Sequence, residues 1–331
     1  MIFPKKSACP YAEKSIPMQK ESSTGCKLSR IATVLSFCSN DFRFLQACID
    51  GVRLFAEQIL VVICDHFFDG SQENYGLLEE VYRRFPEIAF IEYAYDPRVS
   101  YREFSPLYPT HAYWRVDWHN ANRWIGALFA NKEIDYLLFL DCDEIVEGQS
   151  FAQWLSHTRL DNTTCIRFAT YWYYLEARFQ ALETDDLPLL VQRDLPLDIL
   201  WNEEERLGVY LRMPEKKERG VKGVNGLPLF HHYSWVRPKK EFKKKCTTWR
   251  HYWERNWNAL IDQAFETPIQ RDFVRRYTYR EVLPYFDPLV IEIPPVPNIP
   301  IEVHKRNLAH FPNVHAVERK EMWRRGLQAI L

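Results

Sequence analysis

The sequence predicts an α/β fold, in which a mostly parallel sheet is covered by helices on both faces. The first observation behind this prediction is that strand-like apolar runs alternate with runs of helical spacing from residue 31 onward, an order typical of parallel sheets. The second is composition, because 47% of the 331 residues are apolar and 26% are charged, as in an ordinary globular chain. The formal net charge of −1 provides no excess of positive charge, so we expect no nucleic-acid partner.

Each element has its own signal. The apolar runs IATVLSFC, ILVVICD, IAFIEYAY and YLLFL are short and rich in β-branched or aromatic residues, which predicts buried strands. Between them, apolar residues recur at helical spacing, as at Cys48, Val52 and Phe55. The expected order is strand 31–38, helix 46–58, strand 59–65, helix 75–85, strand 88–95, helix 110–129 and strand 136–140.

The flanking segments lack this periodicity. Residues 1–30 are polar and basic, which predicts a flexible leader, and they contain no continuous apolar segment of the kind found in secretory signals. Residues 288–300 contain five prolines, which favours an extended strap followed by a short final helix. No apolar run reaches the ~18–20 residues of a membrane-spanning helix.

Cysteine usage indicates the compartment. The eight cysteines are scattered without C-x-x-C pairs, and Cys64, Cys142 and Cys165 lie in or beside apolar strand-like runs. This pattern is typical of reduced, buried thiols, so we expect a cytoplasmic protein without a cysteine zinc site.

Two carboxylates stand where the strand 136–140 ends. Asp141 and Asp143 follow it at positions i and i+2, and in open α/β sheets ligands bind at the carboxyl ends of strands. Two carboxylates are costly to bury without positive charge between them, and Mg²⁺ and Mn²⁺ prefer oxygen ligands. We therefore expect a divalent-cation site here, with Asp143 facing solvent. The alternative is a solvated turn in which the acids only cap the next helix.

The segments IATVLSFCSND, ILVVICDHFFDGS and NRWIGALFANKEIDYLLFLDCDEI occur in an order that resembles the nucleotide-binding half of GT-A glycosyltransferases, most closely the family 2 enzymes. The resemblance covers residues 31–148. It implies that the first strand and an acid after the second strand hold the nucleoside, that an arginine on the next helix faces the diphosphate, and that Asp-x-Asp binds sugar nucleotide and metal. Three residues separate Asp65 from Asp69-Gly70-Ser71, so either acid can be the nucleoside contact. The implied residues are Cys38, Asp65 or Asp69, Arg123, Asp141 and Asp143.

A second match lies in LFHHYSWVRPKKEFKKK, which is similar to a His-Tyr-Gly-Trp-Val-Arg segment of one group of bacterial family 2-like transferases. The likeness implies that His232, rather than His231, completes the metal shell and that Arg237 contacts the diphosphate. The alternative is that both histidines alternate between the faces of an aromatic core. Residues 237–250 carry seven basic side chains and one acidic, which suits phosphate groups or an anionic lipid surface but is more typical of a solvated helix face.

The catalytic base is expected between these motifs, because the resemblance places an acid shortly before a Gly-aromatic pair. Glu205, three residues before Gly208, fits best and Glu204 second, whereas the exposed start of a helix is the alternative interpretation. Asp185 and Asp186 are competing acids. The implied mechanism is direct displacement, in which the carboxylate accepts the proton of an acceptor hydroxyl while the metal and Arg237 stabilise the departing diphosphate.

The combined prediction is a metal-dependent glycosyltransferase, with Mn²⁺ or Mg²⁺, that moves a sugar from a nucleotide-diphosphate sugar to a hydroxyl of a glycan, lipid or protein, with inversion. We expect peripheral contact with the inner membrane surface through residues 237–250. Two other classes stay open, a non-catalytic GT-A-like glycan-binding protein and a metal-dependent sugar or phosphate hydrolase. The expected segments are a flexible leader (1–30), a nucleotide-sugar-binding half (31–150), an acceptor and catalytic half (151–260) and a C-terminal strap and helix (261–331).

Overall fold

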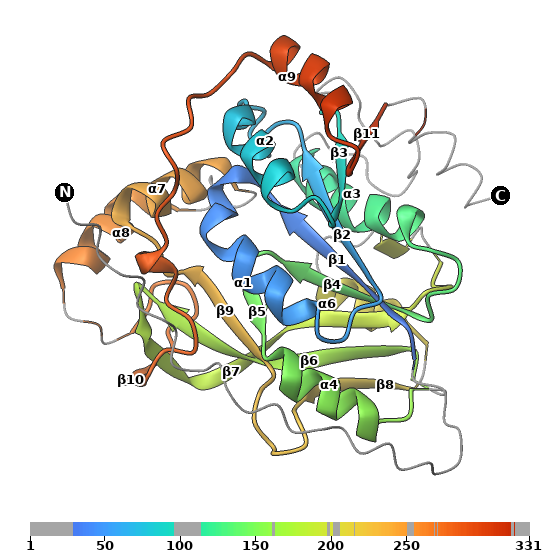
Figure 1. Cartoon of the computed structure of the whole chain (residues 1–331). Coiled ribbons are helices and arrows are strands. Elements are labelled where there is room, and N and C mark those ends of the chain that lie inside the picture. Colours follow the sequence, from blue (N-terminus) through green and yellow to red (C-terminus); the bar gives the residue numbers. More distant parts are fainter. Residues whose placement is uncertain are drawn as a thin grey trace, which may run out of the picture.

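Figure 1 shows the computed structural model of the chain, a twisted sheet flanked by helices on both faces. The structure describes residues 29–95, 114–160, 163–196, 199–200, 206–214, 216–249, 255–267, 269, 271–318 and 321, with the backbone alone for 114–120. These residues form an 11-stranded sheet in the order β11-β3-β2-β1-β4-β7-β6-β9-β5, with β10 beside β7 and β8 beside β6. The predicted α/β architecture with a mixed, mostly parallel sheet is confirmed.

The first part of the sheet is parallel. β1 (Ile31–Phe37) lies between β2 (Gln58–Cys64) and β4 (Tyr136–Asp141), and β3 (Ala89–Tyr93) lies beyond β2. Because these strands run in the same direction, their carboxyl ends lie at one edge of the sheet. The last residue of β4, Asp141, is therefore at the edge where α/β sheets bind ligands.

Alternate residues of β1 face two separate cores, which explains why the strand is apolar throughout. Leu35 belongs to the core beneath α1 (Phe42–Val52) and α2 (Tyr75–Arg84), whereas Val34 belongs to the core beneath α3 (Trp114–Phe129). Strand side chains alternate in direction, so a strand buried on both faces needs a continuous apolar run.

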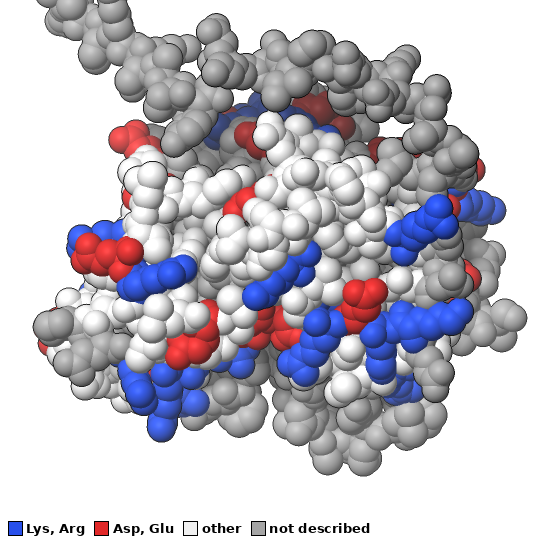
Figure 2. All heavy atoms as spheres, turned by 90° about the horizontal axis from the view of Figure 1, so that it is seen from below, with Lys and Arg blue, Asp and Glu red and all other residues white. Residues whose placement is uncertain are grey.

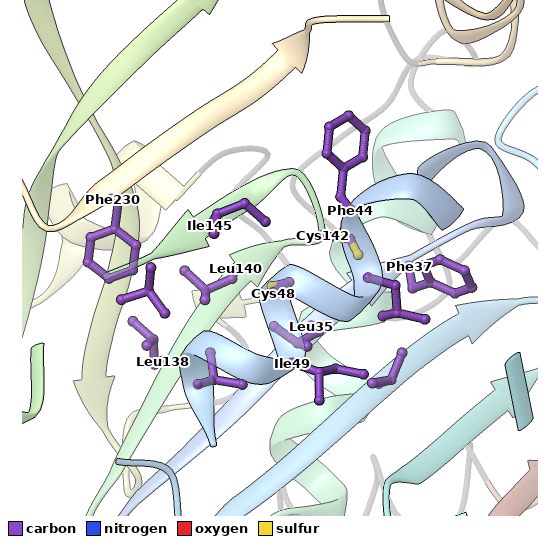
Figure 3. Close-up of a cluster of buried hydrophobic side chains, with 14 of the residues drawn as sticks. Leu35, Phe37, Phe44, Cys48, Ile49, Leu138, Leu140, Cys142, Ile145 and Phe230 are labelled. Carbon is purple, nitrogen blue, oxygen red and sulfur yellow. The ribbon is translucent and has the colours of Figure 1, made fainter. Parts of the chain in front are cut away.

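Helix α1 packs directly on the strand end that carries the acids. Figure 3 shows Cys48 of α1 beside Leu140 of β4, with β5 (Glu144–Val146) next to them. The close approach requires Gly51, because a Cβ atom there would lie 2.6 Å from the backbone oxygen of the last residue of β5. This packing fixes the short loop between β4 and β5, which contains Asp143.

The second part of the sheet consists mainly of antiparallel pairings. β7 pairs antiparallel with β4, β6 and β10, and β9 pairs antiparallel with β5, whereas β6 pairs in parallel with β8 and β9. A third buried cluster, rich in aromatic rings, lies against β6 and β9. The remaining strands are β6 (Cys165–Tyr174), β7 (Glu176–Gln192), β8 (Lys217–Val221), β9 (Phe230–Trp235), β10 (Tyr279–Glu281) and β11 (Val314–Val317). The remaining helices are α4 (Gly148–His157), α6 (Arg206–Arg212), α7 (Lys239–Thr248), α8 (Trp257–Glu266) and α9 (Ile301–Asn307).

The C-terminal extension returns to the first part of the sheet. Residues 291–300 contain no helix or strand, and Asn298 of this strap accepts a hydrogen bond from the backbone N–H of Tyr75 at the start of α2 (2.9 Å). Helix α9 follows over α2, and β11 pairs in parallel with β3 (Figure 1). The extension therefore completes the edge of the parallel sheet.

Some expectations fall outside the described residues. These are the leader up to residue 28 and almost all of the expected final helix. The six described cysteines are free thiols, and no described helix is both long and apolar enough to cross a membrane. On the face shown in Figure 2, basic side chains lie among acidic ones instead of forming one continuous patch.

Candidate active site

A pocket of about 410 Å³ lies at the carboxyl ends of β1, β2 and β4. Its volume lies within the ~300–1,000 Å³ typical of small-molecule sites. Its polar lining includes Cys38, Asp41, Asp141, Asp143, His232 and Lys245. On the side of the second half of the chain it is lined by Trp172, Trp235, Trp249 and Trp257. These tryptophans also belong to, or pack against, the aromatic cluster beside β6 and β9.

Asp143 lies in the loop between β4 and β5 and is held there by backbone pairing. Its carbonyl oxygen accepts a hydrogen bond from the N–H of Tyr233 in β9 (2.9 Å). Its carboxylate is bound by Lys245 Nζ (2.8 Å) and Arg237 Nη2 (3.0 Å) on one oxygen, and His232 Nε2 lies 3.5 Å from the other. Only 3% of the residue is exposed, so the expectation of a solvent-facing Asp143 is wrong.

The partners of Asp143 determine its charge. Burial by itself would raise the pKa of the carboxyl, but Lys245, His232 and Arg237 outweigh burial and hold the pKa well below its usual range. Asp143 is therefore a carboxylate at neutral pH.

Asp141 and Glu144 share a second arginine. Asp141, whose side chain is 30% exposed, lies 3.2 Å from Arg206 Nη2 and 3.9 Å from Arg123 Nη2. Arg206 also donates two hydrogen bonds to the fully buried Glu144, at 2.5 and 2.6 Å. Burial raises the pKa of Glu144, an effect that Arg206 opposes. Arg206 lines the pocket, whereas Arg123 is buried behind Asp141.

Arg237 lies beneath the pocket and does not line it. Its fully buried guanidinium contacts Asp41 (2.5 Å) and Asp143 (3.0 Å) and donates to the backbone oxygen of Asn40 (2.7 Å). Burial by itself would lower its pKa, but the two carboxylates raise the pKa above the usual value. In this arrangement Arg237 acts on the pocket through the two acids.

We call these residues the strand-end cluster. In the described part of the chain it contains four carboxylates and four permanent cations, so its formal charge is balanced. The members are Asp41, Asp141, Asp143, Glu144, Arg123, Arg206, Arg237 and Lys245.

The donor set predicted for a divalent metal does not fit a resident ion. One oxygen of Asp143 already accepts from Lys245 and Arg237, and Asp141 faces Arg206 and Arg123. Among the residues that the structure describes, no group of three or more His, Cys, Asp or Glu side chains is placed to hold a metal ion. All three predicted donors, Asp141, Asp143 and His232, nevertheless line the pocket.

The two neighbouring histidines face opposite sides of β9. His231 lies 2.9 Å from Glu147 through Nε2 and 2.8 Å from the Tyr173 hydroxyl through Nδ1. Burial lowers the pKa of His231, and Glu147 opposes this shift. The alternation expected for a strand thus places His232 at the pocket and His231 on the opposite face.

The three residues expected to contact the nucleoside, Cys38, Asp65 and Asp69, do not all line the pocket. Cys38 lines the pocket, and its thiol donates to Asp41 (3.3 Å), while burial raises its pKa well above the usual value. Asp65 is buried, accepts from the backbone N–H of Tyr95 (2.7 Å) and lies 2.7 Å from His66 Nδ1. Asp69 accepts from the N–H of Ser71 (2.9 Å). Neither acid is among the pocket-lining residues, although His66 is.

Glu73 is a pocket residue that the sequence analysis missed. It is fully buried, and its carboxyl accepts from both the backbone N–H and the hydroxyl of Ser39. Burial raises its pKa to about 7, against the opposing effect of Ser39. A single glutamate before a helix gives no signal of this kind in a sequence.

The expected base falls outside the described residues. Glu204 and Glu205 directly precede Arg206, the first residue of α6 and a pocket-lining residue. The competing acids are in ion pairs. Arg275 binds Asp185 (3.0 Å), while Asp186 is bound by Arg219 and Arg167.

The chain is similar to known proteins in fold and not in sequence. No protein-family model and no curated protein matches the sequence. The fold is similar to glucosyl-3-phosphoglycerate synthase from Mycobacterium tuberculosis, solved with Mn²⁺, uridine diphosphate and phosphoglyceric acid (TM-score 0.34, 14% identity, 81% of this chain and 90% of that chain). It is also similar to the glycosyltransferase GlyE of Streptococcus pneumoniae (0.33, 12%, 74% and 67%) and to 4-diphosphocytidyl-2C-methyl-D-erythritol synthase from Anaerococcus prevotii (0.37, 10%, 61% and 93%).

Proposed function

We propose that this protein is a glycosyltransferase that moves a sugar from a nucleoside-diphosphate sugar to a hydroxyl acceptor. The observation that carries the proposal is the pocket at the carboxyl ends of β1, β2 and β4, where Asp141 and Asp143 lie among fixed cations. A diphosphate needs positive charge, and a sugar ring can bind to the aromatic side chains on the opposite wall.

The two walls suggest two subsites. Cys38 and His66 lie just after the ends of β1 and β2, where a nucleoside would bind, and Asp141 lies at the end of β4. Trp172, Trp249 and Trp257 lie on the acceptor side. The acceptor is a hydroxyl of a glycan, lipid or protein.

The reaction proposed is a direct displacement with inversion. The acceptor oxygen forms a bond to the anomeric carbon while the bond from that carbon to the phosphate oxygen breaks, and the electron pair of the broken bond stays on the phosphate oxygen. The proton of the acceptor hydroxyl passes to a carboxylate, for which Glu205 is the first candidate and Glu204 the second. Both residues directly precede Arg206, which contacts Asp141.

Metal dependence stays a prediction. Asp141, Asp143 and His232 supply donor types that Mn²⁺ or Mg²⁺ accept, but lysine and arginine already bind Asp143. Peripheral membrane contact through residues 237–250 likewise stays a prediction. Two lysines of this segment, Lys239 and Lys243, have part of their charge neutralised by Asp262.

The experiment is calorimetry and thermal unfolding of the full chain with UDP-, GDP- and CDP-sugars, each in excess EDTA and in excess MnCl₂. We expect one nucleotide to bind and to raise the Tm, and Asp141→Asn to weaken that binding. Asp50→Asn is the matched control, because Asp50 lies on the exposed side of α1. Binding of free glycans without any nucleotide would instead favour the glycan-binding class.

A further inference from the structure

The lysines of α7 are not a uniform solvated face. Lys239 and Lys243 both contact Asp262 of the neighbouring helix α8, each at 2.7 Å. Lys244 lies over the ring of Phe67, with its Nζ atom 4.6 Å from the ring centre. Lys245 alone among these four contacts Asp143, at 2.8 Å. Neighbouring residues of one helix thus have different partners, and one lysine is directed into the pocket.

Lys245 contacts Asp143, one of the carboxylates that the sequence assigned to a metal. Its side chain is 16% exposed and lines the pocket, while Arg237 approaches the same carboxylate oxygen from the buried side. Asp143 is therefore held between a guanidinium in the interior and an ammonium at the pocket surface. An ammonium has three N–H donors, and the bond to Asp143 uses one of them.

We propose that Lys245 binds the diphosphate of the donor in place of a divalent metal ion. The inference deepens the proposed function and rests on it. Asp143 then acts as a positioning residue that holds the lysine at the edge of the sheet, with Arg237 behind it.

The charge of the cluster supports this assignment. With four carboxylates matched by four permanent cations, the described cluster has no excess of negative charge with which to attract a divalent ion. A diphosphate, in contrast, can share the ammonium of Lys245 with Asp143. The two N–H groups that do not bind Asp143 can donate charge-assisted hydrogen bonds to the diphosphate oxygens.

The role in the reaction follows from where charge develops. As the bond between the anomeric carbon and the phosphate oxygen breaks, negative charge grows on that oxygen, and a fixed ammonium next to it lowers the energy of this state. The lysine keeps its proton throughout, so the acceptor proton still passes to the separate base.

The test measures binding of UDP, GDP and CDP by calorimetry in excess EDTA and in excess MnCl₂. We expect the nucleotide that binds to do so equally in both buffers, within about 2-fold. Lys245→Met should weaken this binding by about 10- to 100-fold, because one charge-assisted contact is lost, and Lys245→Arg should restore most of it. Lys243→Met is the matched control on the same helix and should bind as the wild type does, because Lys243 is paired with Asp262.

Three results would overturn the proposal. The first is nucleotide binding that requires MnCl₂, and the second is equal affinity in the Lys245→Met and Lys243→Met variants. The third comes from titration of Mn²⁺ alone, followed by electron paramagnetic resonance, if the wild type binds one ion per chain and Asp143→Asn does not. If none of the three nucleotides binds in either buffer, the proposed function fails, and the Mn²⁺ titration still decides whether Asp143 holds a metal.

Discussion

The molecule contains two buried ion clusters of similar chemistry and different surroundings. In the strand-end cluster, carboxylates and cations lie beside a pocket. In the second, which we call the strap cluster, His304 of α9 contacts Glu79 through Nδ1 (3.1 Å) and Glu92 through Nε2 (2.9 Å), and Tyr82 donates to Glu92 (2.6 Å). His304 is fully buried and stacks on Tyr75, with ring centres 4.8 Å apart.

The two clusters differ in whether their charged groups line a cavity that a ligand can enter. Both ring nitrogens of His304 are directed at carboxylates, so the strap cluster joins α9 to α2 and β3. In the strand-end cluster, Lys245 is paired with Asp143 and Asp141 with Arg206. Lys245 and Asp141 nevertheless line a cavity. Buried charge alone therefore does not indicate a site, and our proposal depends on the charge of the strand-end cluster lying at the wall of a pocket.

The largest effect is expected at the proposed base, Glu205. Glu205→Gln keeps the shape of the side chain but removes the proton acceptor, so sugar transfer should fall by roughly 10²–10⁴-fold with nucleotide affinity little changed. The measurement is the transfer rate beside calorimetric affinity, with Glu203→Gln and Glu204→Gln as neighbours for comparison. Near wild-type transfer by all three would show that the glutamate run is only a charged helix start.

A large effect on stability alone is expected in the strap cluster. His304→Ala leaves Glu79 and Glu92 buried without their shared cation, which should reduce the free energy of unfolding by about 3–5 kcal/mol. Urea denaturation measures this, with His310→Ala as the control because His310 is not buried. A change in nucleotide affinity of the folded variant would contradict the separation of the two clusters.

The pH dependence of stability distinguishes the strap cluster from Glu73, the buried acid that lines the pocket. Glu92 and Glu79 raise the pKa of His304 above 6.5 despite burial, so its stabilisation is complete below pH 6.5 and is lost as the pH rises through the higher folded pKa. Burial raises the pKa of Glu73 from 4.5 to about 7, so its contribution, about 3–4 kcal/mol at about 1.4 kcal/mol per pH unit, is complete below pH 4.5 and is lost as the pH rises to about 7.

Two variants separate these windows. Glu73→Gln should flatten the stability curve between pH 4.5 and about 7, and His304→Gln should flatten it above pH 6.5. Thermal unfolding over a pH series measures both. Identical curves for the wild type and Glu73→Gln would show that Glu73 titrates normally.

The smallest effect is expected for the paired histidines of β9. His232→Gln should lower nucleotide affinity by about 3- to 10-fold, since one polar contact at the pocket is altered, whereas His231→Gln should leave it unchanged. Calorimetry of the two variants compares the two faces of one strand. The reverse ranking would place the ligand on the side of Glu147.

The sequence predicted the elements whose periodicity is strong and local. The apolar runs of β1, β2 and β4, separated by segments of helical spacing, predicted the parallel sheet, and the pair Asp141 and Asp143 pointed to the sheet edge at which the pocket lies. The charge balance at that edge could not be predicted, because Arg206 and Lys245 are distant in the sequence and ordinary in type. A run of lysines does not reveal which member turns toward a carboxylate 102 residues earlier.

The return of the strap to α2 and β3 has a consequence for biosynthesis. Glu92 precedes His304 by 212 residues, and at ~5–20 residues per second a ribosome takes about 10 to 40 seconds to add them. During that interval Glu79 and Glu92 lack their shared histidine, and the edge of β3 lacks the strand that later pairs with it. The strands of the parallel sheet are therefore synthesised long before β11, which covers their edge. Throughout the synthesis of the second half, the edge of β3 has backbone N–H and C=O groups that can pair with another chain.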